Sequence, residues 1–133
     1  MSEFPHDSLR VFRDTDELNQ AALELIKEIL TTSLQERGEA HIALAGGSTP
    51  QALHRRLAQA RDIDWDGVHF WFGDERTVPP DHAESNYRMA RESLLDHIPI
   101  ADDRVHRIRG EADPAQAASE YEEWLERHIR ERL

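Results

Sequence analysis

The sequence contains no cysteine among its 133 residues, which excludes disulfide bonds and thiolate chemistry. Basic residues are also scarce, because 16 Lys and Arg stand against 27 Asp and Glu, and Lys27 is the only lysine. The resulting formal net charge of −11 argues against nucleic acid as a partner, since a phosphate backbone requires a basic surface. A small phosphorylated ligand is compatible with this charge, because it needs only a local pocket.

Long apolar runs are absent too, so the sequence predicts no membrane-spanning helix. Residues 1–10 are polar and lack the apolar segment of a secretory signal. We therefore expect a soluble, cytoplasmic protein with no membrane partner. The length suits one domain with its own core.

Apolar periodicity divides the chain into alternating strands and helices. Short runs predict strands at residues 42–45, 68–72 and 105–108, and a further short edge strand at residues 9–12. A first helix is predicted to begin after Asp14, which with Glu17 forms a capping box, and to end near Gly38. A further helix is predicted from about residue 84 to Pro99, and the last one runs from its cap at Asp113 to the end of the chain. Another helix follows the strand at 42–45. The expected core face of the first helix comprises Leu18, Ala22, Leu25 and Ile29. This alternation predicts an α/β fold with an open, mostly parallel sheet and flanking helices.

Two glycines stand between the strand at 42–45 and the helix that follows it. Gly46 and Gly47 permit a sharp turn and a close approach of a ligand to the backbone. Ser48 or Thr49 is expected to cap the helix, and Pro50 suits its first turn. A helix N-terminus with exposed N–H groups binds anions, so this turn is a candidate phosphate site. A plain strand–turn–helix junction remains the alternative.

A charged cluster follows the second strand at Asp74, Glu75 and Arg76. Ligands of open parallel sheets bind beyond the carboxyl ends of the strands, where both the glycine turn and this cluster are expected. Asp74 and Arg76 are therefore predicted to share one rim with the glycine turn. A solvated turn with a local Asp–Arg pair would give the same sequence.

Four stretches resemble the 6-phosphogluconolactonase family, within the wider superfamily that includes the glucosamine-6-phosphate isomerase/deaminases. They are LAGGSTP at 44–50, FGDERTVP at 72–79, HAESNY at 82–87, and VHRI at 105–108 followed by Gly110 and Glu111. They occur in the family's order and together span most of the chain. Arg76 stands where the deaminases usually have tyrosine, so Arg76 and the Ser85-Asn86 pair favour the lactonase.

The resemblance implies a Rossmann-like fold and hydrolysis of 6-phospho-D-glucono-1,5-lactone to 6-phosphogluconate, in the pentose phosphate pathway, without metal or cofactor. It assigns the substrate phosphate to Gly46, Gly47, Ser48 and Thr49. Asp74 and Arg76 are the expected catalytic residues. Arg76 is expected to supply positive charge to the phosphate or to the oxyanion. His82, Ser85 and Asn86 are expected to support the substrate loop.

The sequence departs from the family at the general base, which is a histidine in a Gly-Asp-Gly-His type motif. No such motif occurs here, and His41, His69 and His106 are expected to be packing residues beside strands. The resemblance therefore predicts that residues 1–133 form the N-terminal part of a single lactonase domain whose C-terminal part is absent. The alternatives are an amino-sugar phosphate isomerase/deaminase, a non-catalytic phosphosugar-binding module, and a fragment without independent function. The oligomeric state is left open.

Overall fold

The computed structural model describes residues 9–129. Its regular elements, in chain order, are α1 (Thr15–Arg37), β1 (Ala40–Leu44), α2 (Ser48–Gln59), β2 (Val68–Phe72), α3 (Asn86–Ser93), two 3-10 turns (Leu95–His97 and Asp102–Arg104) and α4 (Pro114–His128). No helix of the described residues is long and apolar enough to cross a membrane.

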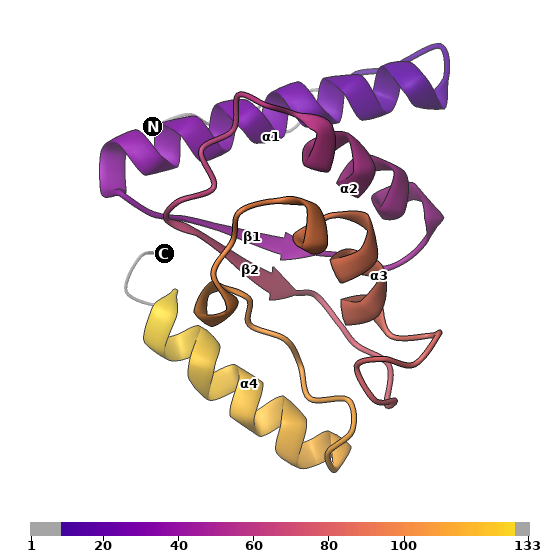
Figure 1. Cartoon of the computed structure of the whole chain (residues 1–133), viewed down its shortest axis with the longest axis vertical. Coiled ribbons are helices and arrows are strands. Elements are labelled where there is room, and N and C mark those ends of the chain that lie inside the picture. Colours follow the sequence, from indigo (N-terminus) through magenta and orange to yellow (C-terminus); the bar gives the residue numbers. More distant parts are fainter. Residues whose placement is uncertain (1–8, 130–133) are drawn as a thin grey trace.

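The two strands form a parallel pair that separates the helices into two layers. β1 and β2 pair in register from Ala40 opposite Val68 to Leu44 opposite Phe72. Figure 1 shows α1 and α2 on one side of the strands and α4 on the other. Because side chains alternate along a strand, every second residue faces the α1–α2 side. The predicted α/β class with a parallel sheet is confirmed.

The main core fills the space between the sheet and α1, α2 and α3. Phe70 and Val68 are fully buried at its centre, and Leu57 of α2 and Leu94 beyond α3 close over them. Apolar burial of this kind is the main favourable term in folding. It fixes both strands against the helices and so places their carboxyl ends.

Both ends of α1 and the start of α4 follow the predicted signals. The carboxylate of Asp14 accepts a hydrogen bond from Glu17 N at 2.9 Å, and that of Asp113 accepts one from Gln116 N at 3.2 Å. Gly38 ends α1 in the left-handed conformation, with φ of 72°. After α3 ends at Ser93, a 3-10 turn completes the segment before Pro99. α4 ends at His128, short of the predicted end, and residues 130–133 lie outside the described part.

Two predictions near the N-terminus are wrong. Residues 9–12 form no strand, and Leu9 and Val11 are 83% and 82% exposed. The stripe assigned to the core of α1 lies largely outside it, since Leu18 and Ile29 are 44% and 47% exposed. α1 instead buries Asn19, Leu23 and Leu30. The helix carries two apolar stripes, and only packing against β1 and α2 decides which one is buried.

The third predicted strand is reduced to one bridge, between Phe70 and Val105, with His106 N donating to Phe70 O at 2.8 Å. The next rung of a parallel ladder would join Phe72 N to His106 O. Instead the hydroxyl of Tyr121, from α4, accepts from Phe72 N at 2.8 Å and donates to His106 O at 2.7 Å. The inserted hydroxyl holds the segment apart from β2, so residues 106–108 do not continue as a strand.

Candidate functional site

The glycine turn and the acidic cluster leave the sheet side by side. Leu44 and Phe72, the last residues of β1 and β2, are register partners, and Gly73 N donates to Leu44 O at 3.0 Å. Both following segments therefore start at the same edge of the sheet, beyond the strand tips in Figure 1. This edge, formed by residues 46–49 and 74–76 together with Asn86, is called the rim below.

The glycine turn presents free donors at the start of α2. Gly47 has φ of 105° and ψ of 172°, a conformation that residues with a side chain rarely adopt. It is the N-cap of α2, so Ser48 and Thr49 lie inside the first turn and the expected side-chain cap is wrong. Within the described residues, nothing accepts a hydrogen bond from the N–H groups of Ser48 and Thr49. Together with the helix dipole, these groups form an anion-binding arrangement.

Asn86 connects the two segments of the rim. Its Nδ2 donates to Asp74 Oδ1 at 2.9 Å and to Asp74 O at 3.2 Å. Its carboxamide also occupies the space that a Cβ at Gly46 would fill, so Gly46 cannot carry a side chain without displacing it. Three of the residues predicted for the site are thereby in one contact chain.

Arg76 lies at the exposed end of the rim. Its backbone N–H donates to Glu75 Oε1 at 2.8 Å, and its side chain is exposed. In the described residues no carboxylate forms an ion pair with its guanidinium. A cation in this position is available to an anionic ligand, because it is not already neutralised by a neighbour.

His82 and Ser85 shape the loop that leads into α3. His82 Nδ1 accepts from Glu84 N at 3.0 Å, and His82 O accepts from Ser85 N at 3.0 Å. Ser85 is the N-cap of α3, with its hydroxyl oxygen accepting from Arg88 N at 3.2 Å. These bonds fix the start of α3, and with it the position of Asn86.

Glu75 has a larger part in the site than its sequence position indicates. Its two carboxylate oxygens accept hydrogen bonds from Asn86 N at 2.7 Å, Ser85 Oγ at 2.9 Å and Tyr87 N at 3.0 Å, besides that from Arg76 N. Sequence reasoning gave Glu75 no role of its own. Known capping patterns join residues three or four apart, whereas Glu75 lies ten residues before Ser85. No local pattern could therefore have identified Glu75 as a partner of the start of α3.

Four histidines gather with Trp71 on the sheet face opposite the main core. This histidine cluster consists of His41, His69, His106 and His128, with Trp71 stacked on His106 at 4.1 Å between ring centroids. Trp71 Nε1 donates to His41 Nδ1 at 3.0 Å, and His69 Nδ1 lies 3.0 Å from His106 Nε2. Burial, with the neighbouring histidines, lowers the pKa of His106 to about 4. The expected packing role of His41, His69 and His106 agrees with this arrangement.

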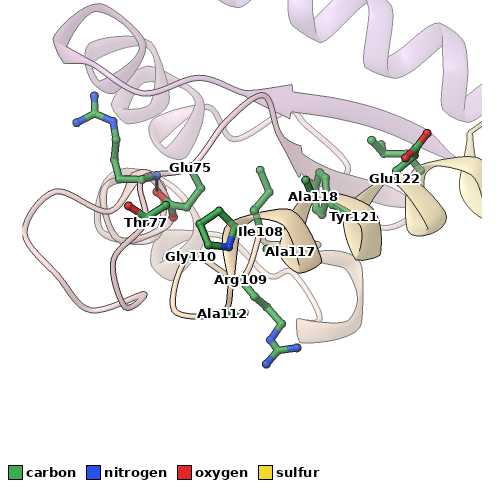
Figure 2. Close-up of a pocket in the computed structure, with 13 residues that line it drawn as sticks. Glu75, Thr77, Ile108, Arg109, Gly110, Ala112, Ala117, Ala118, Tyr121 and Glu122 are labelled. Carbon is green, nitrogen blue, oxygen red and sulfur yellow. Dashed lines mark hydrogen bonds between the residues drawn. The ribbon is translucent and has the colours of Figure 1, made fainter.

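An apolar cavity adjoins the rim on its α4 side. It has a volume of about 370 Å³ and lies between residues 75–77, the 108–112 loop and α4. Figure 2 shows Ile108, Ala117, Ala118 and Tyr121 around it, with Glu75 and Thr77 at one end. Gly110 packs directly against the carbonyl groups of Arg76 and Val78 in the same region. A polyhydroxylated sugar needs convergent polar groups, which this lining supplies only at its edge.

A profile of the family described as glucosamine-6-phosphate isomerases/6-phosphogluconolactonase matches residues 13–133. The chain is 42% identical over 109 residues to a 6-phosphogluconolactonase of Haemophilus influenzae, covering 80% of this chain and 47% of that protein. It also resembles the crystal structure of 6-phosphogluconolactonase from Trypanosoma brucei, with a TM-score of 0.77 at 35% identity, covering 90% of this chain and 50% of the other. The chain belongs to the glucosamine-6-phosphate isomerase/6-phosphogluconolactonase family.

The chain spans about half the length of the curated relatives it matches. A monomeric glucosamine-6-phosphate deaminase has the same fold, with a TM-score of 0.77 at 21% identity, covering 87% of this chain. That likeness concerns the fold alone, since the identity is low. Sequence relatives named 6-phosphogluconolactonase include one of Aggregatibacter actinomycetemcomitans, at 46% identity over 71% of this chain.

Proposed function

We propose that this protein acts on 6-phosphogluconolactone and that the rim binds the substrate. The observation that carries the proposal is the pairing of the open N–H groups of Ser48 and Thr49 with the unpaired cation of Arg76 on one edge of the sheet. The phosphate would lie on the glycine turn, as anions do at helix N-termini. The sequence relatives reported above are named 6-phosphogluconolactonases, which supports this substrate class. The proposal places the protein in the cytoplasm with the phosphorylated sugar.

Hydrolysis of the lactone requires water to add to the ring carbonyl and to lose a proton, which forms a tetrahedral oxyanion. The bond from this carbon to the ring oxygen then breaks, and the ring oxygen takes up a proton from the solvent and leaves as a hydroxyl. Arg76 is suited to stabilise either the phosphate or the developing oxyanion, because charged donors fixed in place stabilise charge as it forms. Asp74, held by Asn86 at 2.9 Å, is suited to accept hydrogen bonds from sugar hydroxyls. The proposal assigns binding and charge stabilisation to these residues.

The alternative within the family is an isomerase/deaminase acting on an amino-sugar phosphate. A non-catalytic phosphosugar-binding module would use the same glycine turn. Parallel assays of the complete gene product with the lactone and with glucosamine 6-phosphate separate the two enzymes. Binding of both phosphosugars without turnover by the complete gene product would favour the module.

The binding site is tested by titrating residues 1–133 with inorganic phosphate and 6-phosphogluconate while amide NMR signals are followed. We expect saturable shifts at Gly46, Gly47, Ser48 and Thr49. Gly47→Val should abolish them, because φ of 105° is not available to valine and the turn must change.

Gly38→Val is the matched control, because Gly38 has φ of 72° at the far end of α1 and no atom within 4 Å of its added Cβ. It should cost stability through the same kind of strain but leave phosphate binding intact. An unchanged phosphate affinity in Gly47→Val would contradict the site.

A further inference from the structure

The carboxylate of Glu75 is the common acceptor for the start of α3. Four donors converge on its two oxygens, at 2.7 to 3.0 Å, and three of them belong to consecutive residues, Ser85, Asn86 and Tyr87. A carboxylate at a helix N-terminus also interacts favourably with the helix dipole. Because it fixes the backbone N–H groups of Asn86 and Tyr87, Glu75 fixes the direction in which the Asn86 side chain leaves α3.

The Asn86 side chain is a wedge with contacts on both sides. Its carboxamide lies against Gly46 on one side, in place of a Cβ, and donates two hydrogen bonds to Asp74 on the other. It is 7% exposed, so it is held inside the rim rather than at its surface. A small rotation of this side chain would press on the glycine turn or release Asp74.

We propose that Glu75 is a positioning residue that holds Asn86 as a wedge between Gly46 and Asp74, and so sets the distance between the phosphate-binding turn and the acidic cluster. Glu75 sets this distance in the ligand-free protein. The effect of Glu75 on ligand affinity rests on the proposed function, since it requires that the glycine turn binds phosphate.

A glutamine at position 75 cannot replace the carboxylate. Glu75 uses both oxygens as acceptors, whereas glutamine has one acceptor oxygen and an NH2 group that only donates. In Glu75→Gln the N–H of either Asn86 or Tyr87 would face that NH2 group. The start of α3 must then shift, and the wedge shifts with it.

The first experiment compares Glu75→Gln with Glu84→Gln, an exposed glutamate in the same loop, in residues 1–133. We expect Glu75→Gln to move the ligand-free amide signals of Gly46 and Gly47 and to weaken inorganic phosphate binding about tenfold. Glu84→Gln should do neither. In an Asn86→Ala background, Glu75→Gln should have no further effect on either readout, because the wedge is already gone.

A role in general stability would give the opposite result, since the effects of Glu75→Gln would be the same with and without Asn86. That outcome, or ligand-free signals of Gly46 and Gly47 that do not respond to Glu75→Gln, would overturn the inference. Absence of phosphate binding by the unmodified chain would instead overturn the proposed function, and would leave the ligand-free coupling intact.

A second pair of variants keeps the inference testable if Glu75→Gln does not fold. Gly46→Ala places a methyl group in the space of the Asn86 carboxamide, so we expect it to lower the urea midpoint of the chain. The same substitution in Asn86→Ala should lower the midpoint much less, because the obstructing group is absent. An equal loss in both backgrounds would show that Asn86 is not the wedge.

Discussion

The hydroxyl oxygen of Tyr121 accepts a hydrogen bond from the backbone N–H of Phe72, the last residue of β2. The same hydroxyl donates to His106 O, and burial raises the pKa of Tyr121 to about 12. One side chain of α4 therefore completes the backbone hydrogen bonding of β2 at the rung that follows the Phe70–Val105 bridge. It also secures α4 to the sheet next to the rim.

Tyr121→Phe should destabilise the chain by about 1–3 kcal/mol, because the buried N–H of Phe72 and the partly buried C=O of His106 lose their shared partner. Urea unfolding followed by circular dichroism measures this loss. Tyr87→Phe removes the same atom from a half-buried tyrosine and should change stability by less than about 0.5 kcal/mol. Equal stability of Tyr121→Phe and the unmodified chain would mean that Phe72 and His106 close into a direct rung.

Neighbouring residues of α1 should respond very differently to a charge. Leu30 is 3% exposed and Ile29 is 47% exposed. Leu30→Glu buries a carboxylate without a partner, so we expect a loss of more than about 3 kcal/mol or failure to fold. Ile29→Glu should cost less than about 1 kcal/mol. Comparable losses in the two variants, measured by urea unfolding, would show that the buried face of α1 is assigned wrongly.

The sequence predicts those features that depend on a few adjacent residues. The strands predicted at 42–45 and 68–72 and the caps at Asp14 and Asp113 are local patterns. β2 and both caps are as predicted, and β1 is present at Ala40–Leu44, which begins earlier and ends before Ala45. The side-by-side placement of the glycine turn and Asp74 follows from parallel pairing of two such strands. These local rules also place Asn86 correctly at the start of a helix.

Features that depend on distant residues could not be predicted. Either stripe of α1 is apolar, and only the tertiary packing buries Leu23 rather than Leu25. The third strand is interrupted by Tyr121, which lies 15 residues from His106. Glu75 reaches α3 across a loop. In each case the decisive partner is outside the window in which periodicity and capping operate.

Stability should fall as the pH falls from 6.5 towards 4. Burial lowers the pKa of His54 from 6.5 to about 4, and His54 is 2% exposed with Nδ1 3.1 Å from Ser93 Oγ. Between these values the unfolded chain binds a proton that the folded chain excludes, so acid favours unfolding. The contribution of His54 is present above pH 6.5 and is lost as the pH falls through 4.

Urea unfolding at pH 7.5, 5.5 and 4.5 measures this dependence. In His54→Gln the loss in the free energy of unfolding between pH 7.5 and 4.5 should be smaller by an amount on the order of 1–3 kcal/mol. His106, whose pKa is lowered in the same direction, should retain part of the slope in that variant. Hydrogen bonds from Arg107 lower the pKa of Glu111 from 4.5 to about 2, so the stability that Glu111 supplies is present above pH 4.5 and is lost only as the pH falls from 4.5 through about 2. A slope that is unchanged in His54→Gln would contradict the burial argument.

Residues 1–133 by themselves should bind 6-phosphogluconate but hydrolyse the lactone little faster than the spontaneous reaction. A general base typically contributes about a hundred- to ten-thousand-fold in rate. His54 is buried in the core, and His69 and His106 bond each other on the sheet face opposite the core. His82, in the loop that leads from the rim to α3, uses Nδ1 to accept from Glu84 N. We therefore expect the described residues to supply binding without proton transfer.

The measurement is lactone consumption at neutral pH with and without the purified chain. Turnover near that of a 6-phosphogluconolactonase relative would contradict the prediction, and its loss in His82→Gln would identify His82 as the base.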